Sequence, residues 1–316
     1  MSFVGGGSDL PSFYRRFGGA VVSTTINQYV YVTVNPKFDH RIRVSYSKTE
    51  EAASVQRIKH PLVREAMKLL GIEGGVEITS IADIPARGTG LGSSSSFTVG
   101  LLHVLHAYAQ RFASADQLAR EACTIEIERC QEPIGKQDQY AAAFGGANFI
   151  EFHPDSTVTI EPIICKRETL RKIEAHTLVF YTGLTRSASR ILQHQNASIS
   201  KKKSQDATRQ MAELARQLRK ELQQNHVASV GEIIHEGWCL KKSLGPGISS
   251  GAIDACYQRA REAGATGGKL LGAGAGGFLM FYAPPDRHDA IAGALGKLRR
   301  MDFRFEPQGS RIIFVH

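Results

Sequence analysis

The sequence predicts an α+β fold divided into two domains, residues 1–168 and 169–316. Apolar runs with the two-residue period of strands alternate with runs that have the 3.6-residue period of helices. With 316 residues, the chain is long enough for one large or two medium hydrophobic cores. A charged stretch without apolar periodicity, residues 165–175, marks the boundary that we expect between the domains.

In the first domain, segments rich in Val, Ile, Thr and Tyr predict strands, and longer amphipathic segments predict helices. We expect strands over residues 20–34, with a break near Asn27, and over 41–46, 76–81, 147–152 and 157–163. We expect helices from Pro11, over 60–70 and 93–110, from the capping pattern at Ser114, and a short one that begins near Asp138.

The same signals predict the elements of the second domain: a strand over 176–182, helices over 204–224, 226–244, 249–263 and 286–300, and strands over 303–307 and 311–315. Gly272, Gly274 and Gly277 formally complete a G-x-G-x-x-G pattern. A dinucleotide fingerprint needs a helix after it, whereas residues 278–282 are short, apolar and aromatic and predict a strand. We therefore expect a glycine-rich loop between two strands rather than a Rossmann motif.

The composition is typical of a soluble globular protein, with 42% hydrophobic and 22% charged residues. No apolar run approaches the roughly 18 residues of a membrane span, and the start of the sequence lacks the pattern of a secretory signal. Five cysteines without a C-x-x-C pair argue against a disulfide framework or structural zinc. We expect reduced thiols and a cytoplasmic protein.

The net charge of +9 and the pI of about 9.4 favour an anionic ligand, either nucleic acid, anionic lipid or a phosphorylated small molecule. The basic residues are scattered, and only residues 201–203 form a tight run, which a solvated helix start explains. We therefore disfavour nucleic acid.

Residues 85–97, P-A-R-G-T-G-L-G-S-S-S-S-F, are the stretch most indicative of function. A glycine-rich loop that opens a helix can cradle a phosphate, because free backbone N–H groups and the positive helix end both face the anion. The serines can cap the helix or reach a metal ion. The alternative is a plain Gly/Ser turn before an ordinary core helix.

One carboxylate on the helix after Ser114 needs an explanation. At 3.6 residues per turn, Ala119, Cys123, Glu126 and Cys130 share one face, and all except the glutamate are small or apolar. The other glutamates of this helix, Glu121, Glu128 and Glu132, fall on a face that can be solvated. A buried carboxylate is costly unless it is paired or binds a cation, so Glu126 is a candidate ligand.

Further candidates lie at the starts of helices, each with a structural alternative. Asp138 could accept a proton or orient a substrate group, or simply cap its helix. Asp9, which follows three glycines, could face a ligand or cap the helix from Pro11 together with Ser8. Arg186 and Arg190, four residues apart, could clamp a phosphate or could be surface cations.

The three glycine-rich segments, in this order and spacing, resemble the three motifs of the GHMP kinases (galactokinase, homoserine, mevalonate and phosphomevalonate kinases). P-x-x-x-T-G-L-G-S-S-S-S is the most specific of them, and the resemblance covers nearly the whole chain. It implies a ribosomal-protein-S5-like N-terminal domain, a ferredoxin-like C-terminal domain, and ATP and Mg²⁺ bound in a cleft around this loop.

The resemblance also implies roles for individual residues. Ser94 and Glu126 match the Mg²⁺-binding pair, leaving the other serines to capping and packing, and Asp138 matches the aspartate that engages the acceptor hydroxyl. The implied ATP contacts are Arg87, Gly88, Gly90, Leu91, Gly92, Ser93, Ser94 and Ser95. The implied substrate contacts are Gly6, Gly7, Ser8, Asp9, Asp138, Gly183, Arg186, Arg190 and Gly274.

Within the family, F-V-G-G-G-S-D-L-P-S-F-Y, E-P-I-G-K-Q-D-Q-Y-A-A-A-F-G-G and Y-T-G-L-T-R-S-A-S-R-I-L are similar to segments of the D-glycero-D-manno-heptose 7-phosphate kinases. This likeness implies phosphorylation of the anomeric hydroxyl in a bacterial capsule, lipopolysaccharide or S-layer pathway. The implied partners are ATP and a sugar phosphate, without nucleic acid or membrane, and a homodimer is left open.

The sequence departs from the family pattern in one respect. The resemblance implies a strand and a basic residue just before the first motif, as in P-L-R-I-S-F-V-G-G-G, whereas this sequence reads from Met1-Ser2-Phe3. Two alternatives to a heptose phosphate kinase stay open: a kinase of an unphosphorylated sugar of the mannose or fucose type, and a non-catalytic sugar sensor. Glu126, Asp138 and Ser94 together argue against the sensor.

Overall fold

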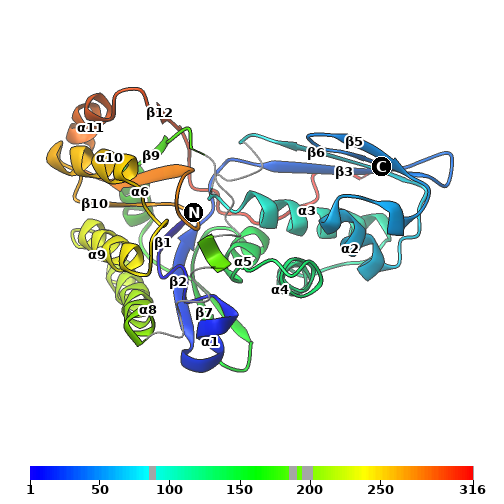
Figure 1. The fold of residues 1–316 in the computed structure, drawn as a ribbon, viewed down its shortest axis with the longest axis horizontal. Helices are drawn as coiled ribbons and strands as arrows, with labels where there is room; N and C mark the ends of the chain where they lie inside the picture. The colour runs from blue at the N-terminus through cyan, green and yellow to red at the C-terminus, as the bar shows by residue number, and fades with distance from the viewer. Residues whose placement is uncertain (85–89, 185–190, 194–201, 316) are drawn as a thin grey trace.

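The computed structural model of the chain describes residues 1–84, 90–184, 191–193 and 202–315. Three four-stranded sheets form its framework, in the orders β1-β2-β7-β8, β3-β6-β4-β5 and β10-β11-β9-β12 (Figure 1). The strands are β1 (Ser2–Val4), β2 (Gly19–Thr24), β3 (Val30–Pro36), β4 (Ile42–Ser45), β5 (Thr49–Ala52), β6 (Val76–Ala82), β7 (Ala147–Phe152), β8 (Val158–Pro162), β9 (Thr177–Tyr181), β10 (Gly267–Leu270), β11 (Phe278–Tyr282) and β12 (Arg299–Arg300).

Helices separate and cover these sheets, as Figure 1 shows. The α-helices are α1 (Pro11–Phe17), α2 (Pro61–Leu70), α3 (Ser93–Tyr108), α4 (Ala115–Cys123), α5 (Gln137–Phe144), α6 (Arg167–His176), α8 (Lys202–Gln223), α9 (Val230–Ser243), α10 (Gly251–Glu262) and α11 (His288–Leu295). Short segments are η1 (Val55–Arg57), η2 (Thr124–Arg129) and η3 (Pro285–Arg287). Among the described residues, no helix is long and apolar enough to cross a membrane.

The sheet β1-β2-β7-β8 joins the two halves of the molecule, because each of its faces belongs to a different core. Val21 and Ile150, a cross-strand pair, pack into the core that contains α3, α4 and α5. The next pair, Val22 and Phe149, packs into the core that contains α8 and α9. Every residue of β2 is buried, as expected for a strand with a core on both faces.

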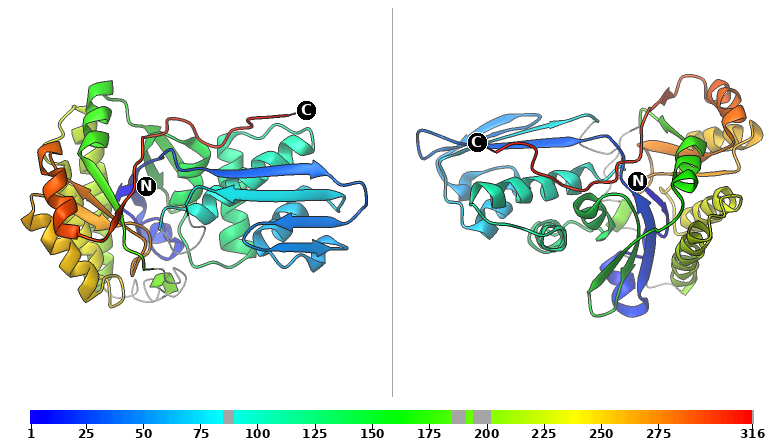
Figure 2. Two further views of the ribbon diagram at one scale, coloured as in Figure 1. Left: turned by 90° about the horizontal axis from the view of Figure 1, so that it is seen from above. Right: turned by 180° about the vertical axis from the view of Figure 1, so that it is seen from behind.

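The sheet β10-β11-β9-β12 is likewise covered on two sides. Val179 and Met280 contribute to the core shared with α8, whereas Phe180 and Phe281 contribute to a core with α10 and α11. Figure 2 shows the helices α8 to α11 gathered around this sheet, and the sheet β3-β6-β4-β5 at the opposite end of the molecule. The glycine loop after β10 is a connection between antiparallel strands, as the sequence predicts.

Most predicted elements are present, but the expected boundary stretch is not a linker. Residues 167–176 form helix α6, whose buried residues Thr169 and Ile173 lie four apart on an otherwise charged helix. Two buried positions are too few to give the stretch a visible apolar period. The division at 168/169 stays a prediction, and the core around Phe149 contains residues from both sides of it.

The strands predicted over 303–307 and 311–315 are wrong, apart from an isolated bridge between Ile26 and Phe305. The chain end instead runs back over the first half of the molecule (Figure 2). The Ser310 amide donates to the Ala142 carbonyl at 3.0 Å. Near residues 304–306 its backbone also bonds to Thr25 and Asn27, and this pairing is too short to make a strand.

Two smaller differences also have local causes. Strand β5, which sequence reasoning missed, carries two glutamates and owes its conformation to pairing with β4. The helix predicted over 286–300 ends at Leu295, because Gly296 takes a φ of +59° and turns the chain into β12.

We predict that Leu218→Ala will lower the free energy of unfolding by about 2–5 kcal/mol, since this side chain is fully buried in the core shared with Val22 and Phe149. Because that core contains residues from both halves, the protein should unfold in one transition. The fluorescence of Trp238, the single tryptophan, should then change together with the far-UV circular dichroism during unfolding. The exposed neighbour Lys220 is the control, and Lys220→Ala should shift stability by no more than about 0.5 kcal/mol. Two separated transitions would contradict a shared core.

Candidate active site

The described part of the phosphate loop begins at Gly90 and leads directly into α3. Gly92 is the N-cap of this helix and has a φ of +71°. As a glycine, it provides no side-chain hydrogen bond to the first turn. A Cβ built on Gly92 would lie 3.2 Å from Cγ of Asp138, so the loop and the start of α5 are in close contact. The structure thus brings two sequence-predicted features together at one helix N-terminus.

The same loop contacts the third glycine-rich segment, between β10 and β11. A Cβ on Gly90 would overlap the Leu271 carbonyl, and a Cβ on Gly272 would overlap Cα of Gly90. Both glycines have positive φ angles, +75° and +78°. Only glycine allows both this backbone conformation and this approach. The contact joins the two halves of the molecule at the candidate site.

Glu126 lies beneath the first turn of α3 and is 1% exposed. Its carboxylate accepts hydrogen bonds from Ser94 Oγ (2.8 Å), Ser95 Oγ (2.8 Å) and Gln139 Nε2 (2.6 Å). It lies in η2, a π-helical segment that follows α4 and forms the last part of the predicted helix, and π-helical turns are frequent at functional sites. Glu128 is exposed, as the sequence predicts.

The structure changes one expectation about the serines and adds a residue to the site. Ser95 was expected to serve capping and packing, but it is buried and binds the same carboxylate as Ser94. Ser94 is the exposed member of the pair. Gln139, fully buried, is a residue that sequence reasoning missed, and its position one residue after Asp138 on a predicted helix gave no signal.

Burial raises the pKa of Glu126, and the three hydrogen bonds only partly offset this effect. A carboxylate beside an exposed hydroxyl offers oxygen ligands, which Mg²⁺ prefers. Within the described residues, no group of three His, Cys, Asp or Glu side chains could hold a metal ion. A magnesium ion at Glu126 and Ser94 would therefore take its remaining ligands from water and phosphate, as it commonly does.

Asp9 is buried and fixed by backbone donors. The Gly7 amide donates to Oδ1 at 2.8 Å, and the Gln137 amide donates to Oδ2 at 3.2 Å. Burial raises the pKa of Asp9, and these amide donors oppose the rise. The Asp9 carboxylate thereby connects the first glycine-rich segment to α5.

The other predicted residues of the first segment lie around this link. The Ser8 hydroxyl is buried and donates to the Gly5 carbonyl at 2.8 Å, so it stabilises the turn. Gly6 lies near the side chain of Gln137, since a Cβ on it would be 3.5 Å from Nε2.

Asp138 occupies the first turn of α5, and its side chain is exposed. The surrounding protein still removes enough water to raise the pKa of Asp138, and repulsion from Asp9 adds to the rise. The amino group of Met1, Lys241 and Lys269 oppose it. The helix N-terminus predicts a stabilised anion, whereas the net shift of the Asp138 pKa is upward, with desolvation as its largest cause.

The remaining predicted residues are not all at this junction. Gly183 follows β9 with a φ of +72°, and Gly274 lies against Ile248, near the start of α10. Arg87, Gly88, Arg186 and Arg190 lie outside the described residues.

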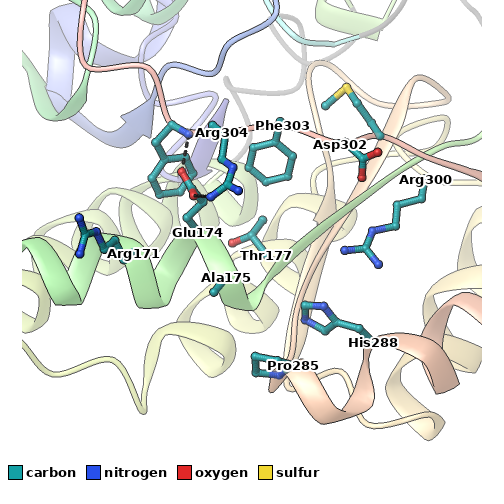
Figure 3. A pocket seen from close by; sticks show the side chains of 12 residues that line it. Arg171, Glu174, Ala175, Thr177, Pro285, His288, Arg300, Asp302, Phe303 and Arg304 are labelled. Carbon is teal, nitrogen blue, oxygen red and sulfur yellow. Dashed lines mark hydrogen bonds and ion pairs between the residues drawn. The ribbon is translucent and has the colours of Figure 1, made fainter.

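A cavity of about 820 Å³ lies elsewhere, between the end of α6, the start of α11 and the segment after β12. Figure 3 shows Thr177, His288 and Arg300 around it, with Glu174 bound to Arg304. It contains none of the glycine-rich segments or predicted carboxylates. We therefore place the candidate active site at the junction of the loops rather than in this cavity.

Residues 57–146 match the family model for the GHMP kinases N terminal domain, and residues 218–299 match the model for the GHMP kinases C terminal domain. The chain belongs to the GHMP kinase family. It is therefore a phosphotransferase with an alcohol group as acceptor and ATP as donor. The predicted family, fold and enzyme class are confirmed.

Relatives of this GHMP kinase include a D-glycero-alpha-D-manno-heptose 7-phosphate kinase of Campylobacter jejuni, 27% identical, with 98% of this chain and 95% of the relative aligned. A solved structure of a D-glycero-D-manno-heptose 1-phosphate kinase from Bacteroides thetaiotaomicron is 26% identical with a TM-score of 0.80, covering 98% and 94% of the two chains. A galactokinase structure from Lactococcus lactis, 16% identical with a TM-score of 0.78, covers 98% and 92% and shares the fold. The chain is accordingly grouped with the sugar kinases of the family.

We predict that Glu126→Gln will stabilise the protein relative to wild type above pH 4.5, the ordinary pKa of a glutamate. The folded pKa is raised, so the stability contribution of Glu126 is fully present below pH 4.5 and is lost as pH rises through the folded value. Urea unfolding measured between pH 4.5 and 7.5 tests this. Glu128→Gln, at an exposed position of the same segment, should leave the curve unchanged. A variant less stable than wild type at pH 7.5 would argue against the cost of ionising Glu126.

Gly90→Ala should weaken ATP turnover by about 100-fold in kcat/KM, because the methyl group would push the phosphate loop away from Leu271. Gly71→Ala is a matched control. Gly71 has a similar φ of +69°, but nothing lies within 4 Å of the added Cβ. Steady-state ADP formation compares the two, and equal losses in both variants would show that backbone strain alone is responsible.

Proposed function

We propose that this kinase uses ATP and Mg²⁺ to phosphorylate the anomeric C1 hydroxyl of D-glycero-D-manno-heptose 7-phosphate, giving the 1,7-bisphosphate. The observation that supports the phosphoryl-transfer site most strongly is the contact between Gly92 of the phosphate loop and Asp138. An acid that reaches solvent beside a phosphate cradle is positioned to meet an acceptor hydroxyl. Similarity to two heptose phosphate kinases supports a heptose phosphate as acceptor.

In this proposal each group has a separate task. Backbone N–H groups at the start of α3, from Gly90 to Ser95, hold the ATP phosphates at the positive helix end. Glu126 and Ser94 hold Mg²⁺, which neutralises phosphate charge when bound. Asp138 accepts the proton of the sugar hydroxyl and directs that hydroxyl toward the γ-phosphate. Asp9 binds a further hydroxyl of the sugar.

The raised pKa of Asp138 suits proton transfer. A general base accepts a proton best when its pKa is not far below the working pH, and desolvation moves Asp138 in that direction. Only the ionised carboxylate is the base. The rate should therefore rise with pH as Asp138 loses its proton.

The main alternative is an acceptor without a phosphate, such as mannose or fucose. The chain is 26% identical to a plant bifunctional fucokinase/GDP-fucose pyrophosphorylase, of which it covers only 29%. The names of the two heptose kinases also place the acceptor's phosphate at different carbons. Comparing acceptors is therefore the decisive experiment.

We expect coupled ADP detection to give the highest kcat/KM with heptose 7-phosphate, compared with heptose 1-phosphate, free heptose, mannose and fucose. Asp138→Asn should lower kcat by about 10²–10⁴-fold and remove the low-pH limb of the rate profile. Asp289→Asn, at an exposed first-turn aspartate of α11, is the control. Near-normal turnover in Asp138→Asn, or faster turnover with a free sugar, would contradict the corresponding part of the proposal.

A further inference from the structure

Two lysines that the sequence analysis did not single out lie buried beside the candidate active site. Lys241 of α9 is 7% exposed, and Lys269 of β10 is 6% exposed. Lysine is almost never buried to this degree without a partner for its charge. Both interrupt apolar segments, W-C-L-K and K-L-L, in which a cation has no obvious packing role.

Each ammonium group keeps unused hydrogen-bonding capacity. Lys241 Nζ donates to the Gly272 carbonyl at 2.5 Å. Lys269 Nζ donates to the Ser2 carbonyl at 2.9 Å and to Ser2 Oγ at 3.3 Å. An ammonium carries three donors, and among the described residues neither lysine forms an ion pair with a carboxylate. Protonating two buried amines without a carboxylate partner is costly, unless an anion joins them when the site is filled.

The surrounding charges show which region the lysines face. Burial lowers the pKa of both lysines, and attraction to Asp9 and Asp138 opposes this effect. Repulsion from Lys241 also lowers the pKa of Lys269, which indicates that the two side chains lie in the same region. The other titratable group that acts on Asp138 there is the amino group of Met1.

A chain of close contacts connects Lys241 to the phosphate loop. Its ammonium binds the carbonyl of Gly272, and Gly272 lies directly against Gly90. Two residues further on, Gly92 approaches the Asp138 side chain. Lys241, the phosphate loop and Asp138 are thus connected by successive close contacts.

We propose that Lys241 and Lys269 form a cationic pair that binds phosphate oxygens at the reacting centre, beside Asp138. This inference rests on the proposed phosphoryl-transfer function and adds two binding residues to it. Phosphate oxygens come from two sources, the transferred group of ATP and the phosphate that the acceptor already carries. The chemistry is the same for both, and kinetics with different acceptors distinguishes them.

The test compares Lys241→Met and Lys269→Met with wild type. We expect each variant to lower kcat/KM about 100-fold, as loss of one charge-stabilising donor does, and to weaken the binding of tripolyphosphate at least 10-fold by calorimetry. If KM rises only for phosphorylated acceptors, the lysines bind the phosphate that the acceptor already carries. If kcat falls with every acceptor, the lysines bind the phosphoryl group that is transferred from ATP.

Thermal unfolding separates binding from a purely structural role. Since methionine removes a buried charge and keeps most of the side-chain volume, the melting temperature should stay the same or rise while activity falls. Lys242→Met is the matched control, because this neighbour on α9 is part-exposed and pairs with Asp254 at 3.1 Å. It should leave the binding of tripolyphosphate within threefold of wild type.

The proposal is overturned if both variants bind tripolyphosphate within threefold of wild type, whether or not their melting temperatures fall. The binding measurement needs no acceptor. If wild type forms no ADP with any sugar phosphate, the proposed function fails, while loss of tripolyphosphate binding in Lys241→Met would still support the lysine site.

Discussion

The arrangement of the site depends on one buried carboxylate. Glu126 lies under the first turn of α3. Its carboxylate accepts hydrogen bonds from the hydroxyl groups of Ser94 and Ser95 and from the side-chain amide of Gln139. These bonds tie η2, α3 and α5 together at the point where the phosphate loop ends. Ionising this group in the interior costs free energy that packing elsewhere must offset. In the proposed function, a Mg²⁺ ion at Glu126 and Ser94 would offset that cost.

Around this carboxylate, the fold assembles residues from opposite ends of the chain. The sheet β1-β2-β7-β8 has a core on each face, so it holds the two halves in a fixed relation. That relation allows Gly272 to touch Gly90, and it places Lys241 and Lys269 near Asp138. Within the described part of the chain, Asp9, Asp138 and the two lysines form no ion pairs with one another, and we propose that the lysine charges serve ligands.

Local sequence patterns predicted most of the elements correctly. The apolar periods of α2, α3 and β7, the Ser114 cap of α4 and the glycine loop after β10 all match. The failures have physical causes. Helix α6 buries too few residues to show a period, β5 depends on its partner strand, and the alternating residues near the chain end pair only through one isolated bridge.

By itself, the sequence determined the helix-opening loop, the burial of Glu126 and the position of Asp138 in the first turn of a helix. These features follow from glycine conformation, helical period and turn chemistry, all of which act over a few residues. The tertiary structure alone decided that Ser95 and Gln139 share the carboxylate with Ser94, that desolvation raises the pKa of Asp138, and that the charges of two buried lysines act on it. Hydrogen-bond partners and desolvation depend on residues far apart in the chain, and no local pattern records them.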